Sequence, residues 1–551
     1  MEDLSESILQ HIFSFLNFTD VIRASAVSRA WLNAVSTLQC LNITDDFIRP
    51  LNSVNRFDQS ARERKMLPKE MVRSMLVSAG CFILKAKEHN LQINQFRFKF
   101  RGKLSYFVPY LMQCVNLIGT ENVREFVLDV GIGGGRLSDY SLPVSVYAAH
   151  SLHKLVVRGL KLSLVGIRGI NLPSLRELDL SCCQVDDEFF EQLIMKCPQL
   201  ENFKIEDCFG FRVFKVLGSH PKLKKIDLMK DEEQDYLYCH APEEIQEIEI
   251  REAPNLEYFR YWSNDDDLLE ILDIGACVNL KVLDLTALCG SHKLLESVEH
   301  LVSHLSVLEE FTLHLFTWIH SSTELQSIKI SSDSLRKLWL GFVNNPVDVR
   351  VDAPYLSEVF YLGFISSNLS FGTSSIKDAN FVKCGEDKIS SFYELVEFLK
   401  TFNHIEAVKL DDFAPRDLAV PTDLDFFDPP LWDIKHLTVG ARYCCGNSYI
   451  PVDLDMLKSL LWMAPRLDTL SFVNGFKSAV TFQFIHGNPE INVEEVPFIC
   501  RNNKVVKVKV ESCPGSAEGL GWKKYLFNGE KSLGCRIKQL KVQVMSKLSG
   551  E

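Results

Sequence analysis

The chain has 551 residues, a formal net charge of -12 and 46% hydrophobic residues. This length suffices for roughly two to four ordinary domains or one long repeat array, and the hydrophobic content is that of a folded protein. The negative charge disfavours general nucleic-acid binding, because phosphate backbones require a concentrated basic surface. The sequence also contains no apolar run long enough to span a bilayer. We therefore expect a protein that binds neither nucleic acid nor a membrane.

Apolar residues recur at intervals of three and four through the first forty residues, which predicts short amphipathic helices. A break at Asn17 to Thr19 separates the first helix from the second. Ser5 is the expected N-cap of the first helix, and Asp20 is expected to cap or charge the start of the second. A forty-residue unit is too small to bury this much apolar surface alone. Part of the surface must face either the rest of the chain or a partner.

The order of these residues, ending in Val27-Ser28-Arg29 and Trp31, resembles an F-box. Members of that family dock onto the Skp adaptor of a cullin-based ubiquitin ligase. One departure from the family is Leu4-Ser5, where Leu-Pro is usual. The resemblance implies an adaptor-binding surface made by Leu4, Ile8, Ile12, Phe15, Leu16, Val27 and Trp31.

We assign residues 1–40 to the F-box and residues 41–90 to a helical connector, with a helix from Pro68 to about Glu88. From residue 91 to 551 one pattern recurs in about sixteen copies. It consists of an apolar residue, two variable residues, an apolar residue, one variable residue and an apolar residue. Leu175-Leu178-Leu180 is a clear copy, and fainter ones extend to Val505-Val508-Val510 and Ile537-Leu540-Val542. This is the leucine-rich-repeat signature, in which each unit supplies one short strand and the units stack.

The segments between copies predict the outer layer of the repeats. The stretch between Leu180 and Leu200 is long enough for a helix. Extra apolar runs at Ile245-Ile248-Ile250 and Leu325-Ile328-Ile330 lie about ten residues before the next copy, which leaves room only for a strand. We therefore predict an α/β fold: a three-helix F-box, then an irregular leucine-rich-repeat solenoid with a curved parallel sheet and a convex side of mixed helices and strands.

F-box and repeats together resemble the plant F-box/LRR proteins, as do the phrases APNLEYF and CPQLENF. This resemblance implies a non-catalytic substrate receptor of an SCF ubiquitin ligase. Its partners would be a Skp-type adaptor, a cullin through that adaptor, and a protein substrate, with no cofactor. Two alternatives remain open at this point: a binding scaffold outside any ligase, and a hormone-type small-molecule co-receptor.

Side chains between the apolar positions alternate onto the open face of each strand. We predict a substrate-binding surface from Tyr258, Arg260 and Trp262 on one strand, with Trp339 and Phe360 in nearby repeats. Lys337, Glu358 and Leu362 occupy matching positions. Exposed aromatic and arginine side chains are typical of binding hot spots. The alternative is that a loop covers them. The earlier repeats carry Glu177, Asp179, Lys204, Lys225 and Asp227, a mixed-charge face that we interpret as solvent surface.

Histidines at 292, 300 and 304 recur with Glu296 at intervals of four, so a helix would align them. Leu301 follows His300, so the zinc-binding His-Glu-x-x-His arrangement is absent. We predict a solvated helix face and no metal site, and no set of catalytic residues. The 16 cysteines form no Cys-x-x-Cys pair, and the acidic start is not a signal peptide. Reduced thiols and a nuclear or cytoplasmic location are therefore expected.

Overall fold

The computed structural model describes residues 4–44, 69–102, 108–118, 122–132, 141–162, 170–230, 245–263, 269–290, 292–318, 326–342, 347–365, 369–372, 375–383, 392–402, 404–413, 417–418, 428–441, 454–474, 478–486, 503–512 and 542–546. The chain divides into two compact units, Met1–Val282 and Leu283–Glu551, and each is described by itself. Among the helices in the described ranges, none has the length and apolar character needed to cross a membrane.

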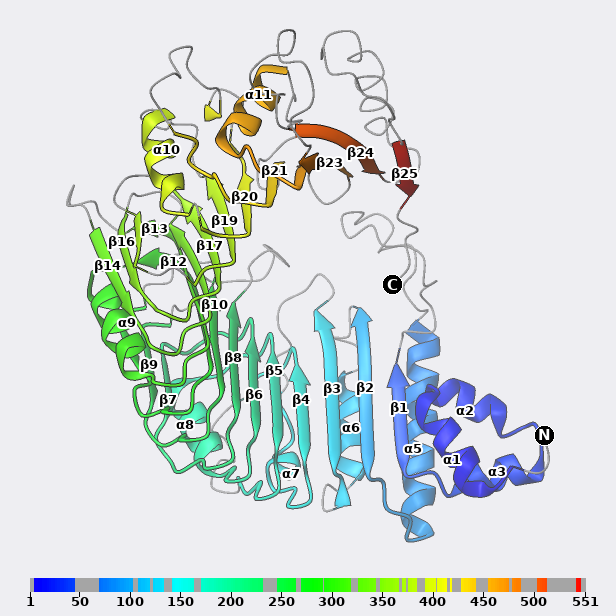
Figure 1. Cartoon of the computed structure of the whole chain (residues 1–551). Coiled ribbons are helices and arrows are strands. Elements are labelled where there is room, and N and C mark those ends of the chain that lie inside the picture. The colour runs from blue at the N-terminus through cyan, green and yellow to red at the C-terminus, as the bar shows by residue number, and fades with distance from the viewer. Residues whose placement is uncertain are drawn as a thin grey trace. The chain divides into compact units, whose positions relative to one another are not determined.

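The first unit is built on a ladder of parallel strands that pair in chain order (Figure 1). These strands are β1 (Cys40–Thr44), β2 (Gln95–Gly102), β3 (Glu125–Ile132), β4 (Lys154–Arg158), β5 (Glu177–Ser181), β6 (Asn202–Glu206), β8 (Lys225–Lys230) and β10 (Tyr258–Ser263). From β2 onward each strand carries one copy of the repeat pattern, as predicted. Strand β1 begins at Cys40, the last residue assigned to the F-box, and otherwise lies within the segment that the sequence assigns to the connector.

The repeat pattern produces this ladder because its apolar residues are buried on one face of every strand. Leu178 and Leu180 of β5 are each 1% exposed. Side-chain amides then tie neighbouring repeats together: Asn255 Nδ2 donates to the carbonyl of Pro221 at 2.7 Å, and Asn279 Nδ2 to that of Pro254 at 2.8 Å. Each such bond links a side chain to the backbone of the preceding repeat at the turn before a strand.

The outer layer of the first unit mixes helices and short strands, as predicted. The helices after the connector are α6 (Val108–Ile118), α7 (Val144–Tyr147) and α8 (Asp187–Met195), and a separate three-stranded parallel sheet joins β7 (Val213–Val216), β9 (Glu247–Ile250) and β11 (Ile271–Asp273). Helix α8 occupies the stretch between Leu180 and Leu200, and β9 carries Ile248 and Ile250. Phe190 of α8 is fully buried and its ring centroid lies 4.6 Å from that of Phe211.

The N-terminal segment forms three helices, α1 (Glu6–Phe15), α2 (Phe18–Ala24) and α3 (Arg29–Ser36), which lie beside β1 and α5 (Lys69–Glu88) in Figure 1. Ser5 occupies the N-cap position of α1, as expected, although its side chain makes no capping bond. Asp20 lies in the first turn of α2 and so places a negative charge at its start, one of the two roles expected for it. It is not the cap: Asn17 caps α2, and its Oδ1 accepts from the Asp20 backbone N–H at 3.0 Å. The chain breaks at Asn17, so the helix begins one turn earlier than Asp20 would require.

The second unit has its own parallel ladder, β13 (Glu310–Trp318), β15 (Lys337–Phe342), β17 (Glu358–Gly363), β19 (Asp378–Lys383), β20 (Ala407–Asp411), β21 (His436–Ala441) and β22 (Thr469–Asn474). Strand β12 (Val282–Gly290) spans the boundary between the units in the sequence. The outer layer contains α9 (His292–His304), α10 (Phe392–Lys400) and α11 (Leu454–Met463), with a parallel sheet of β14 (Gln326–Ser331), β16 (Val347–Asp352) and β18 (Leu369–Phe371).

Two features of the second unit differ from the sequence prediction. Strand β19 was not predicted. The copy at Val505-Val508-Val510 lies on β24 (Asn503–Ser512), which pairs antiparallel with β23 (Ser478–His486), and β23 pairs antiparallel with β22. Antiparallel neighbours do not come from stacked repeats, so the repeat assignment there is wrong. Of the last predicted copy, only Val542 of β25 (Val542–Ser546) lies within the described residues, and β25 pairs parallel with β24.

A buried ion pair ties β19 to a later segment of the same unit. Lys383 Nζ lies 2.7 Å from Asp417 Oδ2, and the two side chains are only 7% and 4% exposed. Two buried charges require each other, because either one alone would be left unpaired in a medium of low polarity.

Candidate functional site

The N-terminal helices hold a small apolar core of their own. Leu9 and Phe13 of α1, Val21 of α2, and Ala34 and Val35 of α3 are its buried centre. The Phe13 and Trp31 rings meet at 5.5 Å between centroids, and the Phe18 ring lies 5.6 Å from Phe82 of α5. The core therefore fixes the three helices to one another and to α5.

Large apolar side chains nevertheless remain exposed on all three helices and the turn between the last two. They are Ile8 at 48%, Phe15 at 74%, Ile22 at 43%, Val27 at 64% and Leu32 at 53%. Ile8 and Phe15 are two turns apart on α1, so they share one face of that helix, with partly buried Ile12 between them. We call these five exposed residues the apolar face.

The structure places six of the seven predicted adaptor-binding residues in two groups, and the seventh, Ile12, is partly buried between Ile8 and Phe15 on α1. Ile8, Phe15 and Val27 belong to the apolar face. Leu4, Leu16 and Trp31 pack against the helix core instead. Sequence reasoning did not assign Ile22 and Leu32 to the surface. The signal was present, because Ile22 directly follows the core residue Val21 and must point elsewhere on the helix.

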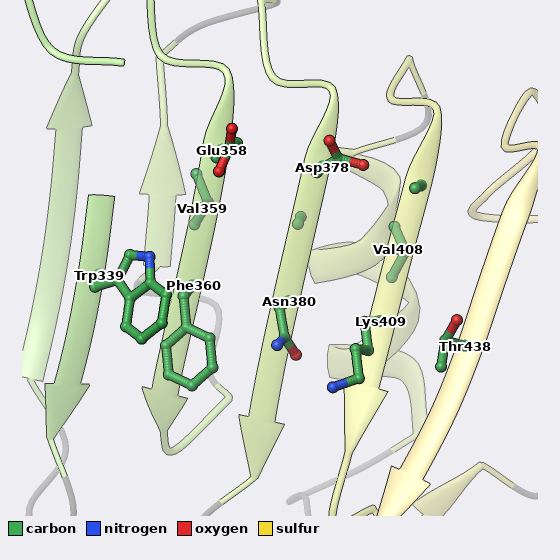
Figure 2. A pocket seen from close by; sticks show the side chains of 11 residues that line it. Trp339, Glu358, Val359, Phe360, Asp378, Asn380, Val408, Lys409 and Thr438 are labelled. Atoms are coloured by element: carbon green, nitrogen blue, oxygen red, sulfur yellow. The ribbon is translucent and has the colours of Figure 1, made fainter. Parts of the chain in front are cut away.

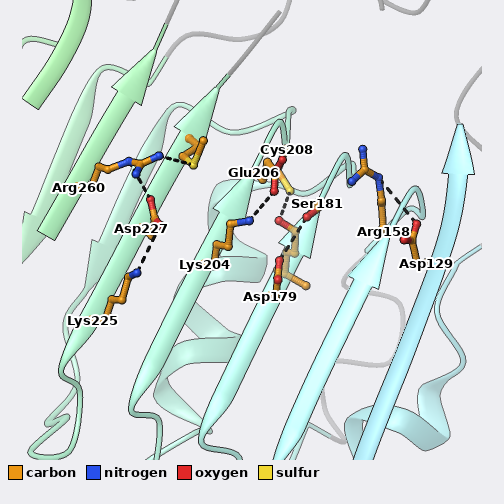
Figure 3. A network of polar contacts seen from close by, with 12 residues as sticks. Asp129, Arg158, Asp179, Ser181, Lys204, Glu206, Cys208, Lys225, Asp227 and Arg260 are labelled. Atoms are coloured by element: carbon orange, nitrogen blue, oxygen red, sulfur yellow. Dashed lines mark hydrogen bonds and ion pairs between the residues drawn. The ribbon is translucent and has the colours of Figure 1, made fainter. Parts of the chain in front are cut away.

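The open face of the first unit carries charges of alternating sign on neighbouring strands (Figure 3). In one register row Asp179, Lys204, Asp227 and Arg260 follow one another on β5, β6, β8 and β10. In the row beside it Glu125, Lys154 and Glu177 do the same on β3, β4 and β5. We call these the alternating charge rows.

Neighbouring side chains of the first unit largely neutralise the charges of the alternating charge rows. Arg97 donates to both carboxylate oxygens of Glu125 at 2.8 and 3.0 Å, and this bonding raises the pKa of Arg97. Lys204 Nζ lies 2.6 Å from Glu206 Oε2. Burial raises the pKa of Asp179, whose Oδ1 accepts from the Ser181 hydroxyl at 3.3 Å. Cross-strand pairs of opposite charge stabilise a sheet, which gives these side chains a structural role.

The predicted substrate-binding residues of this unit are partly buried and engaged. Arg260 Nε lies 3.3 Å from Asp227 Oδ1, and its terminal nitrogen contacts Met229 Sδ at 2.7 Å. The ring of Tyr258 lies under the ammonium of Lys225 at 4.6 Å. Trp262 is partly buried on the same strand. A substrate-binding role for Tyr258, Arg260 and Trp262 stays a prediction.

The open face of the second unit holds an aromatic pair within a shallow cavity. Trp339 of β15 is 51% exposed and stacks on Phe360 of β17, with ring centroids 4.7 Å apart and planes 21° from parallel (Figure 2). The cavity measures about 330 Å³ and crosses five strands from β15 to β21. Glu358, Asp378 and Asn380 also line it. Trp339 and Phe360 were predicted from the sequence; Asp378 and Asn380 were missed.

Two further residues of this face were predicted as exposed. Lys337 is partly exposed, and its Nζ lies 3.0 Å from Glu310 Oε1, which raises the pKa of Lys337. Leu362 is buried, with only 7% of its surface exposed, so its predicted place on an open surface is wrong. At that end of the strands both faces are covered, since Val382, the register partner of Leu362, is also buried.

A partly buried histidine lies in the same row as Leu362. His314 of β13 is the register partner of Gly341 on β15, and a side-chain carbon at Gly341 would overlap the imidazole. Burial lowers the pKa of His314 to about 4. In the unfolded chain its pKa would be near 6.5.

This histidine makes the second unit less stable in acid. As the pH falls from about 6.5 towards 4, His314 becomes protonated in the unfolded chain but stays neutral in the folded chain. The free energy of unfolding therefore decreases. We expect His314→Gln to reduce the stability lost between about pH 7 and about pH 4.5 by about 2 kcal/mol. Urea denaturation of both proteins at the two pH values measures this. An equal loss in the two proteins would contradict the assignment.

The histidines at 292, 300 and 304 lie on helix α9, as their spacing predicted. His300 and His304 stack at 4.0 Å between ring centroids, and His304 Nδ1 lies 2.7 Å from the carbonyl oxygen of His300. Within the described ranges no group of three His, Cys, Asp or Glu side chains is placed to hold a metal ion.

Comparison with known protein families agrees with this architecture. Residues 1–42 match the F-box domain, and residues 111–295 match the LRR repeats of FBD-associated F-box protein At5g56370. The first match covers α1 to α3, and the second runs from within α6 through the rest of the first unit to the start of α9.

Similar curated proteins come from Arabidopsis thaliana. A putative F-box/FBD/LRR-repeat protein, At3g59240, is 23% identical over 286 residues, which cover 51% of each chain. F-box/LRR-repeat protein 13 is 24% identical over 260 residues, covering 47% of this chain and 50% of the relative. F-box protein At3g62430 is 20% identical over 292 residues, covering 51% of this chain and 59% of the relative. The chain thus spans about half the length of the first curated relatives it matches.

Proposed function

We propose, from the premise that this chain is an F-box protein with leucine-rich repeats, that it is the substrate receptor of an SCF-type cullin ubiquitin ligase. The F-box helices would dock on a Skp-type adaptor, and through it on a cullin, while the repeats hold the protein to be ubiquitinated. The chain itself would perform no chemistry. Its contribution would be proximity, because holding two reactants together raises their effective concentration. The proposal includes a location in the nucleus or cytoplasm.

The apolar face is the observation that carries this proposal. Five large apolar side chains, each more than 40% exposed, occur within twenty-five residues of one small helical module. So many exposed apolar side chains on one small module indicate an interaction site, whereas single ones are ordinary. The repeating positions on α1 suit a partner that presents an apolar groove or helices. F-box domains bind Skp-type adaptors, which supplies a partner of that kind.

Co-expression of the full chain with a Skp-type adaptor tests the proposal. We expect the two proteins to co-elute from a sizing column as a one-to-one complex, and a cullin to join that complex only when the adaptor is present. A chain that folds but binds no adaptor would refute the ligase role and leave a binding scaffold outside the ligase.

A further inference from the structure

We propose that the cavity on the open face of the second unit binds an arginine side chain presented by an extended polypeptide. The guanidinium would lie on Trp339 and donate to Glu358, Asp378 and Asn380 (Figure 2). This inference rests on the proposed function, since it names the class of substrate that the repeats recognise.

The first argument is charge. Glu358 of β17 and Asp378 of β19 are direct register partners at the upper rim of the cavity in Figure 2. Lys337 is the register partner of Glu358 on its other side and feels its charge, but the Lys337 ammonium pairs with Glu310 at 3.0 Å, and Lys409 pairs with Asp411. Among the described residues neither Glu358 nor Asp378 lies within ion-pair distance of a cation. Like charges on directly opposite positions destabilise a sheet. The first unit avoids this by alternating its charges, so the second unit here retains a negative pair that a cation from a partner would neutralise.

The second argument is the aromatic pair. Trp339 is half-exposed and stacks on Phe360, so one face of its indole is covered and the remainder of the ring is held in a fixed orientation towards solvent. An indole face attracts cations, and a planar guanidinium also stacks on it. Trp339 and Phe360 are register partners, and they lie two residues further along their strands than Lys337 and Glu358. That spacing is about 7 Å along the strands, which is within the reach of one arginine side chain lying parallel to them.

The third argument is an unsatisfied acceptor in the cavity wall. Asn380 Oδ1 is buried and has no hydrogen-bond partner among the described residues. A buried acceptor without a donor costs free energy, which a ligand that supplies an N–H group recovers. Arginine carries five N–H groups in one plane, so it can donate to Asn380 and to a carboxylate while it stacks. The ammonium of lysine has three donors and no plane to stack, so we expect lysine to bind less tightly.

Selection of ten-residue peptides from a random display library on the immobilised full chain tests this inference. We expect arginine to be enriched at one position. The selected peptide is then made with arginine, lysine or citrulline there. Replacement by citrulline, which removes the charge and keeps the shape, is expected to weaken binding on the order of tenfold. No arginine enrichment, or equal affinity for the three peptides, would overturn the inference.

A matched pair of variants locates the site. Glu358→Gln with Asp378→Asn should weaken the arginine peptide on the order of tenfold and leave the citrulline peptide unchanged. The control is Glu177→Gln with Glu257→Gln, which removes the same number of negative charges from the first unit. These two carboxylates are in ion pairs with Lys154 and Lys281. The control should leave the affinities for the arginine and citrulline peptides unchanged. Equal effects of the two double variants would refute the site. The melting temperature of the Glu358/Asp378 variant should equal or exceed that of the parent, because a like-charge pair is removed.

The same preparations separate this inference from the ligase proposal. If the adaptor fails to co-elute but the arginine peptide still depends on Glu358 and Asp378, the ligase role fails and the site stands. If the adaptor co-elutes but the peptide does not depend on these residues, the site fails and the ligase role stands.

Discussion

Replacement of Phe15 by aspartate is expected to weaken binding of a Skp-type adaptor at least about a hundredfold. Phe15 is 74% exposed on the last turn of α1, so the substitution should not disturb the helix core. Burying a phenylalanine side chain contributes about 2–3 kcal/mol, and a carboxylate left unpaired in the interface adds a cost of similar size. About 3 kcal/mol corresponds to more than a hundredfold in affinity. Calorimetric titration with purified adaptor measures the change.

Val77→Asp on α5 is the matched control, since Val77 is also an exposed apolar residue, at 50%, but lies outside the apolar face. It should bind the adaptor like the parent. Trp31→Ala is a less informative variant, because Trp31 packs on Phe13 and its loss would loosen the helix core. If Phe15→Asp and Val77→Asp bind equally well, the apolar face is not the adaptor site.

The largest effect on stability is expected from Asp417→Ala in the second unit. The substitution leaves the buried ammonium of Lys383 without its carboxylate, which lies 2.7 Å away in the parent. Removing one member of a buried pair costs about 3–5 kcal/mol, because an unpaired charge remains in a medium of low polarity. Urea denaturation should therefore show a free energy of unfolding lower by about that amount.

The double variant Lys383→Met with Asp417→Leu should recover most of this loss, since it removes both charges and retains side-chain volume. Asp433→Ala is the comparison at an exposed ion pair. It breaks the pair between Asp433 and Arg466, whose side chains are 63% and 53% exposed respectively. It should lower the free energy of unfolding by less than about 1 kcal/mol. A loss for Asp417→Ala no larger than that for Asp433→Ala would show that the Lys383 ammonium finds other partners.

The strands were predictable wherever the repeat keeps three large apolar residues in order, as at Leu175, Leu178 and Leu180. Strand β19 was missed because the middle position of its copy is Ala379, too small to stand out between Ile376 and Phe381. Asp378 and Asn380 lie on this strand and were therefore missed as well, although both line the cavity of the second unit. The antiparallel end at β23 and β24 was missed because Val505, Val508 and Val510 satisfy the same spacing as a repeat.

The candidate sites were predictable in part. Amphipathic spacing identified the N-terminal helices, but exposure depends on which side each helix turns to its neighbours. Leu4 and Leu16 therefore proved to belong to the core, while Ile22 proved to be exposed. The pairing of Lys383 with Asp417 joins residues thirty-four positions apart and has no signal in local spacing.

The alternating charge rows limit how the first unit can change over evolutionary time. Lys204 has an acidic register partner on each side, Asp179 and Asp227. Replacing it alone by an acid would place three negative side chains in a row, whereas a simultaneous swap with a neighbour preserves the balance. We therefore expect substitutions at these positions to arrive in compensating pairs, so that co-varying charges in related chains would trace the strand order.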